Sequence, residues 1–118
     1  MFFQNARIFT SDFHFHLGAF QVENGIFTQV LAQNVPEDAI DLHGATVIPG
    51  LIDVHHHGNS NADFSDGDYE GLKRMATYLA GVGVTSFAPA SMTLPYDVLE
   101  KAFATARKLV DEDPEGCA

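Results

Sequence analysis

The amino-acid sequence predicts an α/β fold, in which several β-strands are followed by a strand–helix–strand–helix series. Apolar residues alternate with a period of two in the first half of the chain, and they follow the 3.6-residue period of an α-helix beyond residue 57. A short apolar segment, typical of a buried strand, separates the two helical segments. This order indicates a parallel sheet with crossover helices. Because two strands and two helices leave such a sheet with an open edge, the pattern resembles the beginning of a larger α/β fold.

The first 54 residues predict strands joined by turns. The alternating segments are residues 6–10, 13–22 and 26–32. Asn24-Gly25 lies between the last two segments and supplies the positive φ angles of a tight type I′ hairpin turn. After a loop, the segment 40–54 is rich in Val and Ile but is interrupted by Pro49-Gly50. We therefore expect two strands that meet at this interruption.

The second half predicts two helices with a short strand, residues 83–91, between them. Apolar residues on one face of the first helix are Leu72, Met75, Ala76, Leu79 and Ala80. Asp66 and Asp68 stand where the N-cap of this helix belongs. The second helix lies within residues 94–114, where Pro95 and Pro114 fit its boundaries. Its inward residues are expected to be Leu99, Ala102, Phe103, Ala106 and Leu109.

The composition argues against several classes of function. With 16 acidic and 6 basic residues in 118, the formal net charge is −10, and phosphate binding needs clustered Lys and Arg, so no nucleic-acid partner is expected. No segment approaches the roughly 20 apolar residues that span a bilayer, so we expect no membrane partner and a cytoplasmic location. The single cysteine, Cys117, cannot form an intrachain disulfide.

Three consecutive histidines end the apolar segment that begins at Val47. In an extended strand, residues i and i+2 point to the same side, so His55 and His57 share a face while His56 points away. Two imidazoles in this arrangement can lean toward one cation. We therefore predict that His55 and His57 are metal ligands, with Asp53 on the same face as a carboxylate that orients a ligand or adds favourable charge.

The position of this pair distinguishes it from a second His-x-His pair. The strand before His55 is apolar on both faces, so His55 and His57 should be substantially buried and should need a hydrogen-bond or metal partner. His14 and His16 instead alternate with the apolar residues of the segment 13–17, as on a half-exposed antiparallel strand. We expect His14 and His16 to be solvated.

Other sequence motifs give no competing site. Asp63, Asp66 and Asp68 follow the histidines without the spacing of an EF-hand, so we interpret them as helix-capping and loop residues. His43 is expected in a turn or at a strand edge. The sequence contains no P-loop, no dinucleotide fingerprint and no serine or cysteine nucleophile motif.

The segment "DLHGATVIPGLIDVHHHG" resembles the amidohydrolase superfamily, whose members carry Pro-Gly, an apolar stretch, Asp and His-x-His on the first strand of a (β/α)8 barrel. The matching residues are Gly44, Pro49, Gly50, Ile52, Asp53, His55, His57 and Gly58. The segments "HGNSNADFSD", "GVGVTSFAPASMT" and "EGCA" further resemble the N-acetylglucosamine-6-phosphate deacetylase family. The chain departs from that family at Asn59 and Asn61, where glycine is usual, and asparagine also tolerates left-handed backbone.

This resemblance implies that the chain is the N-terminal portion of such an enzyme. Residues 49–118 would be the first two βα units of a TIM-type barrel. Residues 1–48 would be part of a small β-sandwich, which the family completes with strands from its far C-terminus. Both domains would then be incomplete in this chain.

The resemblance also implies a metal-dependent hydrolase of amino sugar metabolism, which deacetylates the sugar phosphate N-acetylglucosamine 6-phosphate. Only His55 and His57 correspond to metal ligands of the family, and the expected divalent cation is zinc or iron. The catalytic aspartate, the remaining ligands and the phosphate-binding residues would lie beyond Ala118. The substrate-binding residues are therefore unknown, and the 118-residue piece alone should be inactive. Members of the family commonly form homodimers.

Two alternative functions stay open. The first is another amidohydrolase, one that hydrolyses a cyclic amide or deaminates a heterocycle. The second is a non-catalytic module for metal binding or protein interaction. Two imidazoles alone should hold zinc weakly, so tight stoichiometric binding by this piece would favour the module.

Overall fold

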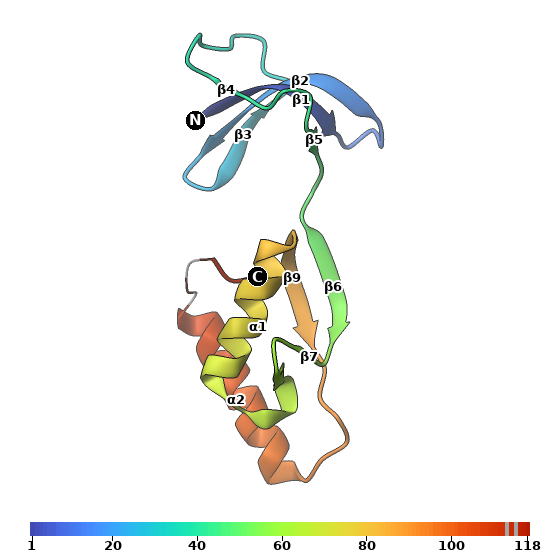
Figure 1. The fold of residues 1–118 in the computed structure, drawn as a ribbon, viewed down its shortest axis with the longest axis vertical. Helices are drawn as coiled ribbons and strands as arrows, with labels where there is room; N and C mark the ends of the chain where they lie inside the picture. Colours follow the sequence, from blue (N-terminus) through green and yellow to red (C-terminus); the bar gives the residue numbers. More distant parts are fainter. Residues whose placement is uncertain (113, 115) are drawn as a thin grey trace. The chain divides into compact units, whose positions relative to one another are not determined.

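The computed structural model describes residues 1–112, 114 and 116–118, and these residues have the predicted α/β class, with many short strands. The chain divides into two compact units, residues 1–49 and residues 50–118. Figure 1 shows the β-strands of the first unit and the strands and helices of the second. Among the described residues, no helix is long and apolar enough to cross a membrane.

The first unit is a five-stranded sheet. Its strands are β1 (Phe2–Phe9), β2 (Phe15–Glu23), β3 (Ile26–Val30), β4 (Ile40–Asp41) and β5 (Thr46–Val47). β1, β2 and β3 form an antiparallel series, while β4 and β5 both pair with β1 in parallel. The predicted turn between β2 and β3 is confirmed, because Asn24 has a φ of 50° and Gly25 has a φ of 77°.

The core of this unit is small. Ala6, Ile8 and Phe20 are buried in it, and the ring of Phe3 stacks on that of Phe20 at 4.8 Å. In the segment 13–17, His14 is solvated as predicted, but the expectation that the apolar side chains pack on the other face was wrong, because they are exposed. Phe13, for example, is 82% exposed and lies in the turn before β2 with a φ of 63°.

The second unit contains the predicted strand–helix–strand–helix order. Its main elements are β6 (Leu51–His56), α1 (Tyr69–Gly81), β9 (Val84–Pro89) and α2 (Tyr96–Glu112). β6 and β9 pair in parallel, with α1 as the connection between them, and both helices lie on one side of the two strands (Figure 1). A Cβ atom at Gly50 would lie 2.1 Å from Oγ1 of Thr85, so glycine permits the close approach with which β6 begins.

A short hairpin and a single helical turn follow β6 where the sequence predicted only a loop. The hairpin pairs β7 (Gly58–Asn59) with β8 (Ala62–Asp63), and the turn η1 (Phe64–Asp66) comes next. Asp68 is the N-cap of α1, as predicted, whereas Asp66, the other residue expected there, belongs to η1. Asp63 and Asp66 form a capping box around η1, and the Asp68 side chain accepts hydrogen bonds from the first turn of α1.

The core of the second unit lies between the two helices and β9. Its buried residues are Phe64, Leu72, Met75, Ala76, Ala102 and Leu109. The predicted inward face of α1 is confirmed. In α2, Phe103 is 56% exposed, although its ring still meets the edge of Phe64 at 5.5 Å. Phe87 of β9 packs against this cluster, so the helices cover β9.

The expectation that β6 is buried on both faces was wrong. Leu51, Ile52 and Val54 are 53%, 69% and 77% exposed. The reason is that β6 has one neighbouring strand, β9, and that the helical core packs on β9. Exposed apolar side chains and an unpaired strand edge are unfavourable in water. Further structure that covers the apolar side chains and the free edge of β6 would therefore stabilise it.

Candidate metal centre

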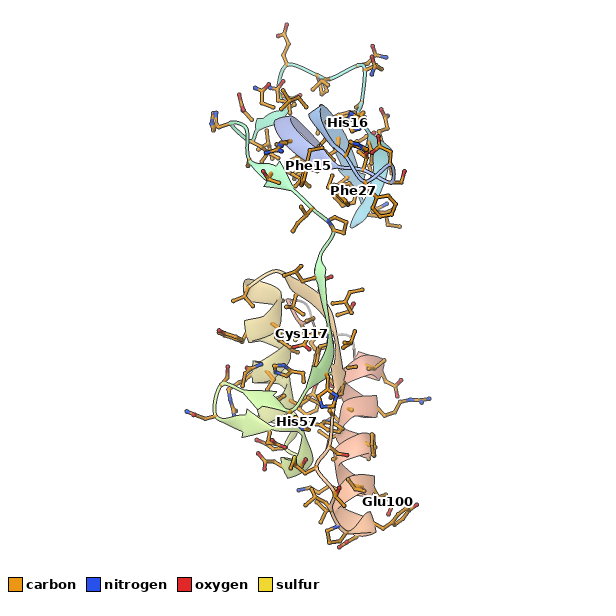
Figure 2. All side chains as sticks on the ribbon, turned by 90° about the vertical axis from the view of Figure 1, so that its right-hand side faces the viewer. Phe15, His16, Phe27, His57, Glu100 and Cys117 are labelled. Carbon is orange, nitrogen blue, oxygen red and sulfur yellow. The ribbon has the colours of Figure 1, made fainter. Side chains whose placement is uncertain are left out.

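The three consecutive histidines lie at the carboxyl end of β6. His55 and His56 are the last residues of the strand, and His57 precedes the β7–β8 hairpin. Figure 2 shows His57 beside that hairpin. Ligands of parallel α/β folds bind at the carboxyl ends of the strands, so the histidines stand at the end of the sheet where a site is expected.

The structure brings the rings of His55 and His57 together. Their centroids lie 4.9 Å apart, and the two Nε2 atoms lie 3.1 Å apart. Two nitrogens that bind one cation at about 2.0–2.1 Å, with an angle of about 90–110° between them, are themselves about 2.8–3.4 Å apart. The spacing of the two Nε2 atoms therefore fits a shared divalent cation.

The described residues supply two ligands to such a cation and no more. Among them, no group of three or more His, Cys, Asp or Glu side chains is placed to hold a metal ion. Nδ1 of His57 is buried and has no hydrogen-bond partner among these residues. Since a metal-binding histidine normally donates its second ring N–H to an acceptor, both the cation and His57 need further groups.

The burial of the pair differs from the prediction. His55 is exposed and His57 is partly buried. The cause is the exposed position of β6, because the helices pack on β9 and leave the side of β6 that carries His55 uncovered. The pair is identified by its geometry, and burial does not distinguish it.

Asp53 contacts a different histidine from the one expected. Its Oδ1 accepts the backbone N–H of His55 at 3.1 Å, and its Oδ2 lies 2.9 Å from Nδ1 of His56. The backbone N–H of His55, followed by the ring of His56, holds the pKa of Asp53 below its usual value. The register between β6 and β9 shifts between Asp53 and His56, and such an irregularity redirects side chains, so strict alternation fails here.

His56 is partly buried and has partners on both sides of its ring. Its side chain is 15% exposed, its Nε2 lies 2.8 Å from the side-chain nitrogen of Asn59, and its ring meets Phe87 edge-on at 5.9 Å. Strand alternation predicts only that His56 points away from the His55–His57 pair. The polar residue Asn59, three positions after His56, was the available signal that His56 has a partner.

The other histidines lie away from this pair in the sequence and form local contacts. In the first unit, Nε2 of His16 lies 2.8 Å from Oδ2 of Asp12, and Nδ1 of His14 lies 2.7 Å from the carbonyl oxygen of Asp12. His43 lies in a turn with a φ of 50°, as predicted. His14 and His43 are exposed, and His16 is partly exposed.

Comparison with known proteins supports the predicted resemblance. No family model matches the chain. It is 35% identical over 79 residues to an N-acetylglucosamine-6-phosphate deacetylase of Vibrio furnissii, a match that covers 67% of this chain and 20% of the relative. A Bacillus subtilis protein of the same name is 33% identical over 64 residues, covering 54% of this chain and 16% of that protein.

Solved structures of proteins with this name also match. The deacetylase of Pasteurella multocida matches with a TM-score of 0.86 and 27% identity, covering 99% of this chain and 32% of that structure. The deacetylase of Thermotoga maritima matches in fold with a TM-score of 0.76 and 21% identity, covering 97% of this chain and 29% of that structure. The resemblance to N-acetylglucosamine-6-phosphate deacetylases is therefore confirmed, and the chain spans about a fifth of the length of the first of these curated relatives.

Proposed function

We propose that the chain is the N-terminal portion of a metal-dependent amidohydrolase, which hydrolyses N-acetylglucosamine 6-phosphate to glucosamine 6-phosphate and acetate. The observation that carries this proposal is the His55–His57 pair, whose Nε2 atoms lie 3.1 Å apart at the carboxyl end of a parallel strand. Similarity to relatives named N-acetylglucosamine-6-phosphate deacetylase supports the choice of reaction and substrate.

The proposal includes a fold for the complete enzyme. Residues 49–118 would be the first two βα units of a (β/α)8 barrel, and residues 1–48 would be part of a β-sandwich. The parallel pairing of β6 with β9 around α1 supports the barrel, because this unit is the repeat of that fold. The exposed apolar residues of β6 would be covered by further strands and helices of the barrel.

In this proposal His55 and His57 hold a divalent metal ion, zinc or iron, through their Nε2 atoms. The ion would lower the pKa of a bound water and polarise the amide carbonyl of the substrate. Asp53 acts through His56 and through the backbone of His55, since its carboxylate bonds to both. The remaining ligands, the general base and the residues that hold the phosphate would come from the rest of a longer chain.

The substrate and the partners are part of the same proposal. We expect the enzyme to act on a small sugar phosphate in the cytoplasm and to form a homodimer, as the family commonly does. The net charge of −10 supports a protein without a nucleic-acid partner, because binding a phosphate backbone needs clustered positive charge.

The direct test is an assay of the full-length protein. Acetate release should be measured with N-acetylglucosamine 6-phosphate, and hydantoin and dihydroorotate should be tested beside it. We expect turnover of the sugar phosphate, and loss of turnover and of one equivalent of metal in His57→Ala. Turnover of a cyclic amide instead would favour the alternative amidohydrolase.

A second test separates an enzyme from a binding module. The metal content of residues 1–118 alone should be low after dialysis, because two imidazoles hold a cation weakly. Tight, stoichiometric metal on this piece, lost in His57→Ala, would favour a module. The residues encoded after Ala118 give a further check, since a His-x-Glu-Gly-Pro-like segment should follow in a deacetylase of this family.

A further inference from the structure

We propose that Asp53, His56 and Asn59 form a hydrogen-bonded chain that positions the His55–His57 pair, with Nδ1 of His56 donating to Asp53 and Nε2 of His56 accepting from Asn59. The inference rests on the metal-binding role of the pair in the proposed function. It assigns a positioning role to His56, which lies between the two ligands and does not bind the cation itself.

The contact with Asp53 fixes one end of the His56 ring. Oδ2 of Asp53 lies 2.9 Å from Nδ1 of His56. An ionised carboxylate has no proton to donate and only accepts hydrogen bonds. The proton of this bond therefore belongs to Nδ1 of His56.

The contact with Asn59 fixes the other end of the ring. The side-chain nitrogen of Asn59 lies 2.8 Å from Nε2 of His56 and 3.4 Å from the carbonyl oxygen of Met75 in α1. That carbonyl oxygen can only accept, so the amide nitrogen of Asn59, and not its oxygen, faces α1. The amide then has one N–H for each acceptor. Nε2 of His56 accepts the second N–H, so the ring proton lies on Nδ1.

This chain of bonds acts on the ligand pair through the backbone. The second oxygen of Asp53 accepts the backbone N–H of His55 at 3.1 Å. The carbonyl oxygen of His56 accepts the backbone N–H of Ala90 at 2.9 Å, just after β9. His56 is thus anchored by its side chain and by its main chain. His55 and His57 are its two neighbours in sequence. Anchoring His56 therefore fixes the backbone positions from which the side chains of His55 and His57 extend.

The chain of bonds depends on the side-chain amide at position 59, because glycine there would have no side-chain donor for His56 or for Met75. Asn59 lies in β7, and its bond to Met75 ties the end of β6 to α1. The packing of α1 therefore supports the geometry of the His55–His57 pair.

The tautomer can be measured directly. Long-range ¹H–¹⁵N correlation spectra of the metal-free full chain, recorded at about pH 8 where an ordinary imidazole is neutral, report which nitrogen of each histidine is protonated. We expect a protonated Nδ1 and an unprotonated Nε2 for His56. In Asp53→Asn the amide nitrogen can donate to Nδ1, which weakens the preference for a proton there, so the share of the tautomer protonated on Nε2 should rise.

The positioning role is measured by the affinity for Co²⁺, read by calorimetry and by the visible absorption of the bound ion. Asn59→Ala keeps both ligands, and we expect its affinity to fall by about 10-fold, the lower end of the range for residues that hold metal ligands in place. Asn61→Gly removes an exposed amide from the same hairpin and should leave the affinity unchanged.

Each result decides the proposal. A protonated Nε2 on His56 in the unmodified chain overturns it, and so does an unchanged Co²⁺ affinity in folded Asn59→Ala. If Asn59→Ala does not fold, the tautomer in the unmodified chain still decides. Both readouts are independent of substrate. A chain that does not deacetylate the sugar phosphate but shows the tautomer and the affinity change would contradict the proposed substrate and still support the positioning role of His56.

Discussion

The two His-x-His pairs of this chain share a longer pattern and use it differently. Asp12 precedes His14 by two residues, as Asp53 precedes His55. In both segments the aspartate accepts the backbone N–H of the first histidine at 3.1 Å. The patterns diverge at the second carboxylate oxygen. Oδ2 of Asp12 contacts the second histidine of the pair, His16, whereas Oδ2 of Asp53 contacts the histidine between the pair.

This difference decides whether the histidines can act together. In the first segment, the rings of His14 and His16 each contact Asp12. In the second segment the middle histidine takes the carboxylate, so the rings of His55 and His57 face each other. Asp12 lies in a turn, next to Phe13 with a φ of 63°, while Asp53 lies within a strand beside a register shift. The two pairs have the same spacing. Their backbone conformation therefore determines that His55 and His57 form a candidate metal site, whereas His14 and His16 bind the aspartate of a turn.

The largest expected effect comes from the core beneath the second pair. Met75 is fully buried, so Met75→Ala should lower the free energy of unfolding of residues 50–118 by about 2–5 kcal/mol. Because the first pair lies in the other compact unit, the NMR signals of His14 and His16 should stay in place. Tyr78→Ala, a change at a 54% exposed residue of the same helix, is the control and should cost at most about 0.5 kcal/mol. Equal destabilisation of both units would contradict this independence.

The next effect concerns metal binding. His57→Ala should weaken Co²⁺ binding by about 100-fold or more, because losing a ligand costs more than losing a residue that orients one. The matched variant His16→Ala removes the second histidine of the other pair and should bind Co²⁺ like the unmodified chain. Calorimetric titration of the three proteins measures both affinities. A comparable loss in His16→Ala would mean that the two pairs are equivalent.

A smaller effect is expected at the N-cap of α1, the helix that holds Asn59. The side chain of Asp68 accepts hydrogen bonds from the backbone N–H groups of Glu70 and Gly71. Asp68→Ala should therefore lower the free energy of unfolding by about 1 kcal/mol, as measured by urea denaturation. Asp68→Asn keeps an acceptor and should lose much less. If Asp68→Asn is as unstable as Asp68→Ala, the cap contributes through charge and not through its hydrogen bonds.

The smallest effect is a pH dependence in the first pair. Hydrogen bonds from Thr10, then from His16 and the backbone of His14, hold the pKa of Asp12 well below its usual value. A lowered pKa in the folded chain stabilises the turn above the unfolded value of about 3.9, and this stabilisation is lost as the pH falls through the folded value. Carboxyl ¹³C NMR should show Asp12 still ionised at about pH 3, where ordinary carboxylates are mostly protonated. In His16→Ala the pKa should rise, and an unchanged pKa would exclude the contact with His16 as a cause.

Local signals were enough to predict most elements of this chain. The Asn24-Gly25 turn, the N-cap at Asp68 and the buried face of α1 all follow from residues within a few positions of one another. The same holds for the approach of His55 to His57, since a two-residue period places both side chains on one face of a strand. The β7–β8 hairpin was missed because its strands are only two residues long.

The tertiary structure alone decided the direction of Asp53, the exposure of His55 and the partners of His56. The direction of Asp53, the exposure of His55 and the orientation of Asn59, a partner of His56, depend on residues that are distant in sequence. The pairing of β6 with β9 introduces the register shift after Asp53, and the carbonyl of Met75 in α1 orients the amide of Asn59. The two-residue period of a strand determines which side chains leave the backbone on the same face. Neighbouring strands and helices determine which groups those side chains contact and whether they are buried, because hydrogen bonds and packing across the fold outweigh local alternation.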